Sequence, residues 1–123
     1  MITERPLKIT SYKYLDIWKL GKEIVKLIYH MTSKFPPREN FSLSQQMRKA
    51  AISIPSNVAE GFNRYHNKEY RQFLFIALGS CAELETQVEI SLDLEYIDPE
   101  TFKTINEKLN HETRMLRNLI KRL

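Results

Sequence analysis

The chain has 123 residues, of which 42% are hydrophobic and 28% charged, and its formal net charge is +4. This length predicts one domain over residues 1–123, and the composition excludes a disordered or collagen-like chain. No apolar run approaches the roughly 20 residues of a membrane span, the N-terminus lacks the apolar segment of a signal peptide, and Cys81 is the only cysteine. We therefore expect a soluble, cytoplasmic protein without an internal disulfide.

The first predicted element is a helix over about residues 12–33. Apolar residues recur there at three- and four-residue spacing, which places them on one face. The members of this stripe are Tyr14, Ile17, Trp18, Gly21, Ile24, Val25, Ile28 and Met31. Pro36 and Pro37 end the helix, because proline disfavours the helical conformation of the residue before it.

A second helix is predicted over about residues 43–64, although it contains a proline. Ser42 and Gln45 have the pattern of a capping box, in which a hydroxyl and an amide satisfy the first backbone N–H groups. The apolar stripe then continues through Pro55 to Val58 and Phe62. This continuity indicates one helix rather than two.

Pro55 is the unusual residue of this helix. A new helix could begin at Pro55, but its cap would then be Ile54, which offers no side-chain acceptor. A new helix could instead begin after Asn57, with Asn57 as its cap and Glu60 completing a capping box. Either break would interrupt the apolar stripe, so we expect a single helix kinked at Pro55. Proline has no N–H, so the carbonyl of Ala51 loses its hydrogen bond at a cost of roughly 3 kcal/mol. Water, a neighbouring hydroxyl or a packing gain from the bend could offset this cost.

Asn67 is predicted to cap a third helix over about residues 67–95. Residues 73–78 are six consecutive apolar residues. Successive helical residues point about 100° apart, so this run needs cover on all sides, and we expect another subunit to cover the part that includes Phe75. The small side chains of Gly79 and Ser80 would allow a close approach of another backbone.

A fourth helix is predicted over about residues 99–122. Asp98 supplies its cap, Pro99 its first residue and Glu100 an acid near the positive end of the helix dipole. Its apolar stripe consists of Phe102, Ile105, Leu109, Leu116, Leu119 and Leu123. Four helices with short connections predict an all-α fold, an antiparallel up-down four-helix bundle with a proline-kinked second helix.

Two stretches, SLSQQMRKAAISIPSNVAEGFNR and FLFIALGSCAELE, closely resemble the four-helix-bundle proteins encoded by intervening sequences in bacterial 23S ribosomal RNA genes. IWKLGKEIVKLIYHMT and FPPRENFSLS extend the resemblance over nearly the whole chain. The chain is also similar to the accessory proteins of diversity-generating retroelements, basic pentamers that bind nucleic acid and a reverse transcriptase.

This resemblance implies a four-helix bundle that assembles into a ring-shaped homopentamer and has no known enzymatic activity. The residues that it marks for the family motif and assembly are Ser53, Pro55, Ser56, Asn57, Glu60, Gly61, Arg64, Phe75, Gly79 and Ser80.

The charges are unevenly distributed along the chain. Between Arg71 and Lys103 there are seven acidic residues and no lysine or arginine. An up-down bundle brings the turn between the second and third helices to the same end as the C-terminus of the fourth. This end, which we call the basic pole, gathers Arg64, Lys68, Arg71, Arg114, Arg117, Lys121 and Arg122, together with Lys8 and Lys13 near the N-terminus. The opposite end is largely acidic.

Two interpretations of the basic pole stay open. The cations could complement the helix dipoles, or they could bind the phosphates of RNA or DNA. Tyr65, His66 and Tyr70 lie among them and could either stack on unpaired bases or plug the end of the core.

The polar residues around Pro55 form a ridge, because Ser53, Asn57, Glu60 and Arg64 follow helical spacing and Ser56 lies beside them. We expect the ridge to form hydrogen bonds within the bundle or across a subunit interface, with Glu60 paired to Arg64, rather than to contact RNA.

Known catalytic patterns are missing. None of the three histidines has a glutamate three residues before it, which argues against a di-iron bundle, and no zinc-protease, P-loop or dinucleotide motif occurs. Cys81 lies among apolar residues, which predicts a buried structural thiol. We therefore expect no catalytic residue, metal or cofactor.

Two functions remain. The first is a non-enzymatic oligomeric accessory protein that binds nucleic acid through the basic pole. The alternative is a scaffold for a protein partner such as a reverse transcriptase, without direct nucleic-acid contact. A membrane partner is not expected.

Overall fold

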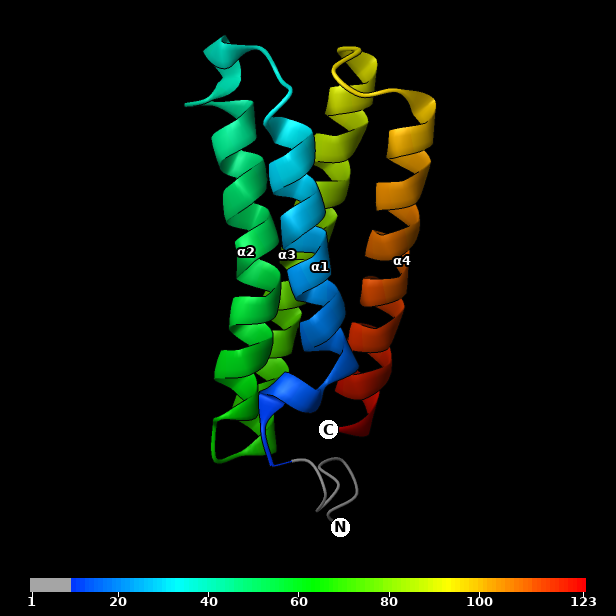
Figure 1. Ribbon diagram of the computed structural model, residues 1–123. Coiled ribbons are helices and arrows are strands. Elements are labelled where there is room, and N and C mark those ends of the chain that lie inside the picture. Colours follow the sequence, from blue (N-terminus) through cyan, green and yellow to red (C-terminus); the bar gives the residue numbers. More distant parts are fainter. Residues whose placement is uncertain (1–9) are drawn as a thin grey trace.

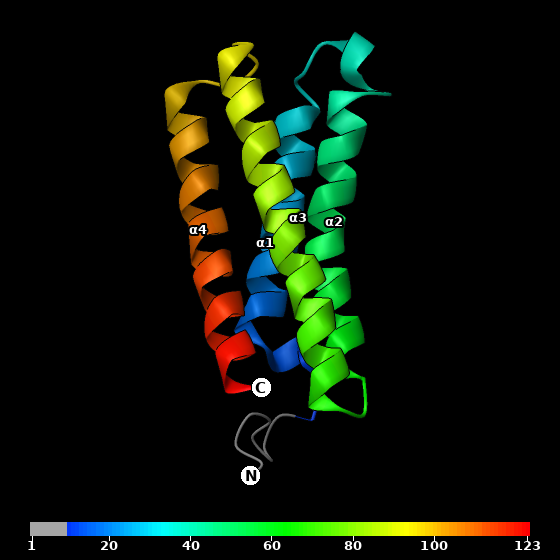
Figure 2. The ribbon, with the colours of Figure 1, turned by 180° about the vertical axis from the view of Figure 1, so that it is seen from behind.

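A computed structural model describes residues 10–123, which form four long helices and two short 3-10 turns and contain no strand. The helices are α1 (Asp16–Thr32), α2 (Leu43–Phe62), α3 (Asn67–Asp93) and α4 (Pro99–Arg122), and the turns are η1 (Tyr12–Tyr14) and η2 (Pro37–Glu39). Consecutive helices run in opposite directions (Figure 1). Both α1 and α3 pack against α2 and α4, as the view from behind also shows (Figure 2). The predicted all-α four-helix bundle is confirmed.

The first helix begins later than predicted. Residues 12–14 form the separate turn η1, and Leu15 is extended, with φ −79° and ψ 132°. The hydroxyl of Ser11 accepts a hydrogen bond from the N–H of Lys13 at 3.2 Å, and the ring of Tyr12 packs edge-on against Trp18, 5.3 Å between centroids. The extended backbone of Leu15 thus separates this turn from α1.

The capping box predicted for Ser42 and Gln45 is wrong. The Ser42 hydroxyl donates to Oε1 of Glu39 at 2.7 Å, and the same oxygen accepts the N–H of Leu43 at 3.4 Å. The Tyr96 hydroxyl donates to the other oxygen of Glu39 at 2.7 Å. These hydrogen bonds, that of Ser42 first, lower the pKa of Glu39. One carboxylate therefore starts α2 and ties the α1–α2 connection to the α3–α4 connection.

Helix α2 runs through Pro55 without interruption, as predicted, and no second helix starts at Asn57. The Asn57 amide instead donates back to the carbonyl oxygen and hydroxyl of Ser53, at 2.8 and 2.9 Å. Pro55 is buried against Gly21 of α1, where an added Cβ would lie 3.3 Å from the Pro55 Cβ. The proline thus packs in the interior of the bundle, and the kink itself stays a prediction.

The ends of α3 also differ from the sequence prediction. His66, rather than Asn67, occupies the N-cap position of α3, and no side chain caps this end. At the other end Glu95 adopts the left-handed conformation, with φ 62°, which stops the helix before Tyr96. Asp98 caps α4 as predicted, because its carboxylate accepts the N–H of Thr101 at 2.7 Å.

The core lies between the four helices and forms one cluster of buried apolar side chains. The apolar run 73–78 is only partly inside it: Leu74 and Ala77 are buried, whereas Phe75 and Ile76 are 53% and 51% exposed. One chain therefore leaves the outer side of this run uncovered. No helix in the described part of the chain is long and apolar enough to cross a membrane.

Gly61 of α2 lies against α3 with no room for a side chain. An added Cβ at Gly61 would lie 2.8 Å from the Cβ of Phe73 and 3.1 Å from the carbonyl oxygen of Tyr70. A Cβ at Gly79 would meet nothing within 4 Å. The close backbone approach expected at Gly79 is thus not made within the chain.

Candidate nucleic-acid interface

The fold brings the predicted basic pole together at one end of the bundle. The α2–α3 turn and the C-terminus of α4 lie at this end, and the two other connections lie at the opposite end (Figure 1). Lys68, Arg114, Arg117, Lys121 and Arg122 are exposed, and Arg64 and Arg71 are half-buried. Lys8 lies outside the described residues.

Arg64 is held by neighbours within the chain. Its guanidinium forms the predicted ion pair with Glu60, 3.0 Å from Nη2 to Oε2, and lies over the ring of Phe73, 4.7 Å from the centroid. The other six predicted cations form no ion pair with any described carboxylate. Their positive charge is therefore available to a ligand.

The helix dipole explains only part of this cluster. Cations at the C-terminus of α4 complement the negative end of its dipole. Lys68, however, lies in the first turn of α3, which begins at Asn67, and the positive end of a helix disfavours cations there. Arg71 lies beyond this turn, where the dipole has little effect on a cation. The dipole interpretation therefore fails for the α3 residues.

The three rings of the basic pole have different environments. Tyr70 is 1% exposed and packs edge-on against Phe62, 6.0 Å between centroids, so it plugs the end of the core. Tyr65 is 89% exposed and contacts His66, 4.9 Å between centroids. Of the two tyrosines, only Tyr65 presents its ring to solvent.

A shallow hollow lies beside the α2–α3 turn. Its volume is about 400 Å³, and its lining consists of Tyr12, Ala59, Glu60, Asn63 and Arg64. The hollow joins η1 to the end of α2, so polar groups from two elements face one open space.

The polar ridge around Pro55 is used inside the chain. The Ser80 hydroxyl of α3 donates to the Ser53 hydroxyl at 2.8 Å, and Asn57 donates to the same hydroxyl at 2.9 Å. Ser56 is exposed beside them. Of the two expected roles for the ridge, hydrogen bonding within the bundle is the one that these contacts provide.

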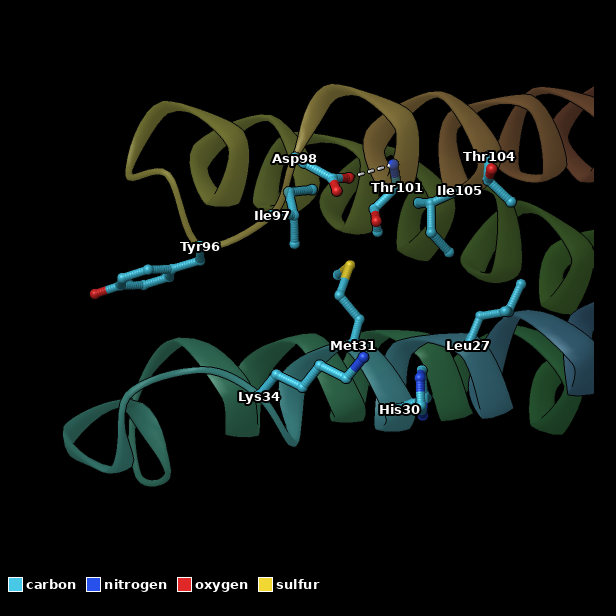
Figure 3. Close-up of a pocket in the computed structure, with 10 residues that line it drawn as sticks. All are labelled: Leu27, His30, Met31, Lys34, Tyr96, Ile97, Asp98, Thr101, Thr104 and Ile105. Carbon is cyan, nitrogen blue, oxygen red and sulfur yellow. Dashed lines mark hydrogen bonds between the residues drawn. The ribbon is translucent and has the colours of Figure 1, made fainter.

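A second hollow, of about 380 Å³, opens at the other end of the bundle between α1 and the start of α4 (Figure 3). Met31 of α1 and Lys34, which follows this helix, face Ile97 and Thr101 across it. The acidic residue in the lining of this hollow, Asp98, already caps α4. None of the predicted site residues lines the hollow. This hollow is therefore separate from the basic pole.

The interior contains a carboxyl group that the sequence analysis missed. Glu112 of α4 is fully buried, and neither of its oxygens has a hydrogen-bond partner among the described residues. Burial raises the pKa of Glu112 to about 8, so the group is mostly neutral at pH 7. Its position between Leu109 and Leu116 in the apolar stripe of α4 is the sequence signal that would have revealed it.

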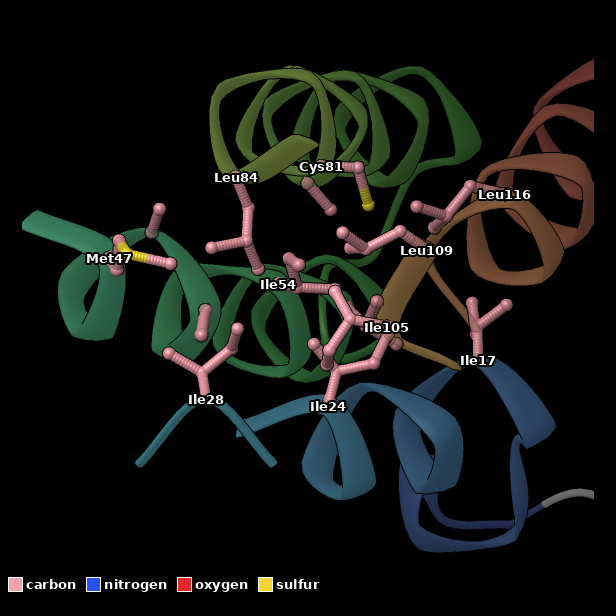
Figure 4. Packing of buried hydrophobic residues seen from close by; sticks show 14 of the residues in the cluster. Ile17, Ile24, Ile28, Met47, Ile54, Cys81, Leu84, Ile105, Leu109 and Leu116 are labelled. Atoms are coloured by element: carbon pink, nitrogen blue, oxygen red, sulfur yellow. The ribbon is translucent and has the colours of Figure 1, made fainter. Parts of the chain in front are cut away.

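Residues from all four helices meet at this level of the core. An added Cβ at Gly21 would lie 3.4 Å from Oε2 of Glu112 and 3.4 Å from Cδ of Pro55. Cys81 points inward from α3 (Figure 4). Burial and the nearby Glu112 carboxyl raise the pKa of Cys81 to about 12, so the predicted buried thiol is confirmed. We call Gly21, Pro55, Cys81 and Glu112 the central layer.

The fold and the site define an all-α four-helix-bundle protein with an exposed basic pole and, among residues 10–123, no cluster of potential metal ligands. The profile of the 23S rRNA-intervening sequence protein family matches residues 13–118, and the chain belongs to this family. The family resemblance predicted from the sequence is thus confirmed.

One solved structure supports the same fold. It is the crystal structure of a protein of unknown function from the S23 ribosomal protein family of Bacteroides thetaiotaomicron VPI-5482. The two chains are 24% identical with a TM-score of 0.77, and the match covers 85% of this chain and 95% of that one. A search among curated proteins found no match.

Proposed function

We propose that this protein is a non-enzymatic, oligomeric accessory protein that binds nucleic acid through the basic pole. The observation that carries this proposal is the group of six unpaired cations at one end of the bundle. One of them, Lys68, lies in the first turn of α3, where the helix dipole disfavours positive charge. Phosphates are ligands that such a surface attracts without sequence preference. The family is named for intervening sequences of 23S rRNA, and RNA is therefore the first ligand to test.

Self-association is the second part of the proposal. Phe75 and Ile76 are about half exposed on α3, and Gly79 beside them leaves room for another backbone. A second copy of the chain would cover this apolar surface, and the family resemblance implies a pentamer. A ring would repeat the basic pole in every subunit, so that weak single contacts add up to useful avidity.

Charge reversal tests the binding surface. The change is Lys68→Glu, Arg114→Glu, Arg117→Glu and Lys121→Glu together, which spares Arg64 because that side chain is paired to Glu60. The quadruple variant is expected to lose binding to a structured RNA in fluorescence anisotropy at low ionic strength. The wild type is expected to bind with an affinity that falls steeply as salt is raised, because bound phosphates release counterions.

The matched control changes acidic residues far from the basic pole. Replacing Glu89, Asp93 and Glu95 with glutamine is expected to leave RNA binding nearly unchanged. A wild type that shows no salt-sensitive binding to RNA or DNA would refute the proposal. Retained binding by the quadruple variant would refute the assignment of the surface. Salt-insensitive capture of a reverse transcriptase alone would favour the scaffold alternative.

Assembly is tested separately. Phe75→Glu puts a charge into the proposed subunit contact and is expected to lower the molar mass measured by light scattering. Phe41→Glu, at an 88% exposed ring in the α1–α2 connection, is the control and is expected to leave the molar mass unchanged. A wild type that is monomeric at micromolar concentration would contradict this part of the proposal.

A further inference from the structure

We infer that the basic pole recognises unpaired nucleotides, with Tyr65 as the ring on which a base stacks. This inference rests on the proposed function and names the form of nucleic acid that the same surface takes. Tyr65 is 89% exposed in the α2–α3 turn, between Arg64 and the exposed residues His66 and Lys68. A large ring left in solvent among cations matches the combination that single-strand binding sites use.

The surroundings of Tyr65 leave its ring accessible. The nearby Tyr70 fills the end of the core, whereas the Tyr65 ring is not packed into the core. His66 meets Tyr65 edge-on, at 80° between ring planes, and this arrangement leaves a ring face for a ligand. Lys68 is close enough along the chain to contact the phosphate of a stacked nucleotide.

The hollow beside the turn extends this surface. Tyr12 contributes a second ring, and the Asn63 amide contributes both a hydrogen-bond donor and an acceptor. Glu60 also lines the hollow, and its carboxylate disfavours a phosphate there but not the edge of an uncharged base. Bases inside a duplex are stacked on each other and cannot reach a protruding ring, whereas unpaired bases can.

The test compares three oligonucleotides at low ionic strength by fluorescence anisotropy: an unstructured uridine strand of about 15 nucleotides, its DNA counterpart and an RNA duplex of equal length. Tyr65→Ala is expected to weaken binding of both single strands by about 5- to 150-fold, because stacking on one aromatic contributes roughly that factor. Duplex binding is expected to change less than about twofold, because the phosphate contacts remain. Tyr65→Trp should restore single-strand binding.

Phe41→Ala is the matched control, because Phe41 is equally exposed and lies in the α1–α2 connection, away from the α2–α3 turn. If Tyr65→Ala binds single strands as the wild type does, while the quadruple charge variant binds nothing, the stacking inference is overturned and the proposed function stands. If the wild type binds no nucleic acid, both fail. Equal losses for single strands and duplex would also overturn the inference.

A second, independent inference concerns the central layer. We infer that the Glu112 carboxyl donates its proton to the carbonyl oxygen of Ala51, which Pro55 leaves without a backbone N–H. The buried carboxyl has no partner among the described side chains and backbone N–H groups. It shares the small space beside Gly21 with the Pro55 ring, which occupies the position of the missing donor. A buried acid without a partner and a carbonyl that has lost its helical donor can satisfy each other.

The groups that α1, α2 and α3 contribute to the central layer do not replace the Glu112 carboxyl as a donor. Cys81 is the titratable side chain that α3 contributes to the central layer, and its thiol is a weak hydrogen-bond donor. Gly21 and Pro55, from the other two helices, carry no polar side chain. A carboxylic acid offers both one O–H donor and sufficient length to reach a neighbouring helix.

A double-mutant cycle at pH 6 tests this pairing. Pro55→Ala restores the backbone N–H to Ala51, and Glu112→Met removes the donor with little change of volume. The loss in the folding equilibrium constant caused by Glu112→Met is expected to be about 3- to 10-fold larger with Pro55 present than in the Pro55→Ala background. Glu112→Gln keeps a donor and is expected to show little coupling. Equal losses in both backgrounds, or equal coupling for the Gln and Met variants, would overturn the pairing.

Discussion

Glu112→Gln is expected to remove a steep dependence of stability on pH. In the folded chain burial raises the pKa of Glu112 to about 8, whereas an unfolded chain has a glutamate pKa of about 4.3. The folded state therefore binds more protons than the unfolded state between these values, and the free energy of unfolding must fall as pH rises. Above the folded pKa both states are ionised, and the dependence levels off.

The expected magnitude follows from the two pKa values. One proton held by the folded state alone changes the free energy of unfolding by about 1.4 kcal/mol per pH unit. Between pH 5 and pH 8 this amounts to a loss on the order of 3 to 4 kcal/mol, which is a large part of the 5–15 kcal/mol typical of a domain. A glutamine cannot ionise, so its contribution is constant over the same range.

Urea unfolding followed by circular dichroism measures this effect at several pH values and one protein concentration. The difference in unfolding free energy between wild type and Glu112→Gln should change by the stated amount across the range. The exposed residue Glu107, on the same helix, provides the control variant Glu107→Gln, which should follow the wild type. Parallel pH profiles for wild type and Glu112→Gln would show that Glu112 is not a buried neutral acid.

Three further changes test the packing and the caps. Gly61→Ala should lower the free energy of unfolding by about 1 to 3 kcal/mol, because its Cβ would lie 2.8 Å from that of Phe73; an unchanged urea midpoint would contradict the close contact. Gly79→Ala should reduce the molar mass in light scattering without unfolding the chain, since only another subunit could meet its Cβ; a gain of roughly 1 kcal/mol at unchanged mass would argue against a partner there. Asp98→Ala should cost about 1 kcal/mol in urea unfolding by removing the hydrogen bond from Thr101, and Asp98→Asn should recover most of it.

Local signals in the sequence are sufficient to predict a helix or its start where the residues that determine it lie within a few positions. The apolar stripe carried α2 through Pro55, and Asp98 with Pro99 gave the start of α4. The start of α2 depends instead on Glu39, which also binds Tyr96, more than fifty positions away. Glu39 lies only three residues before Ser42, but the Tyr96 hydroxyl that also binds Glu39 leaves no local pattern, and the spacing of Ser42 and Gln45 predicts a cap that Ser42 does not form.

The candidate site also has features that the sequence predicts and features that only tertiary packing decides. The up-down topology predicts that the basic residues lie at one end of the bundle. In this topology the direction of each helix decides at which end its residues lie. The roles of Tyr65 and Tyr70 could not be separated from sequence, since both are aromatic residues near a turn and only tertiary packing decides which is buried. Glu112 occupies an apolar register, but whether such a residue is tolerated depends on the space left by Gly21 on another helix.

The central layer links the four helices through a shared volume. Gly21 has no side chain, and an added Cβ would lie within 3.4 Å of both Pro55 and Glu112. A larger residue at any one of these positions therefore requires a smaller one elsewhere in the layer. The four positions behave as one unit of variation: in a library of variants, accepted replacements should appear as matched sets rather than one at a time.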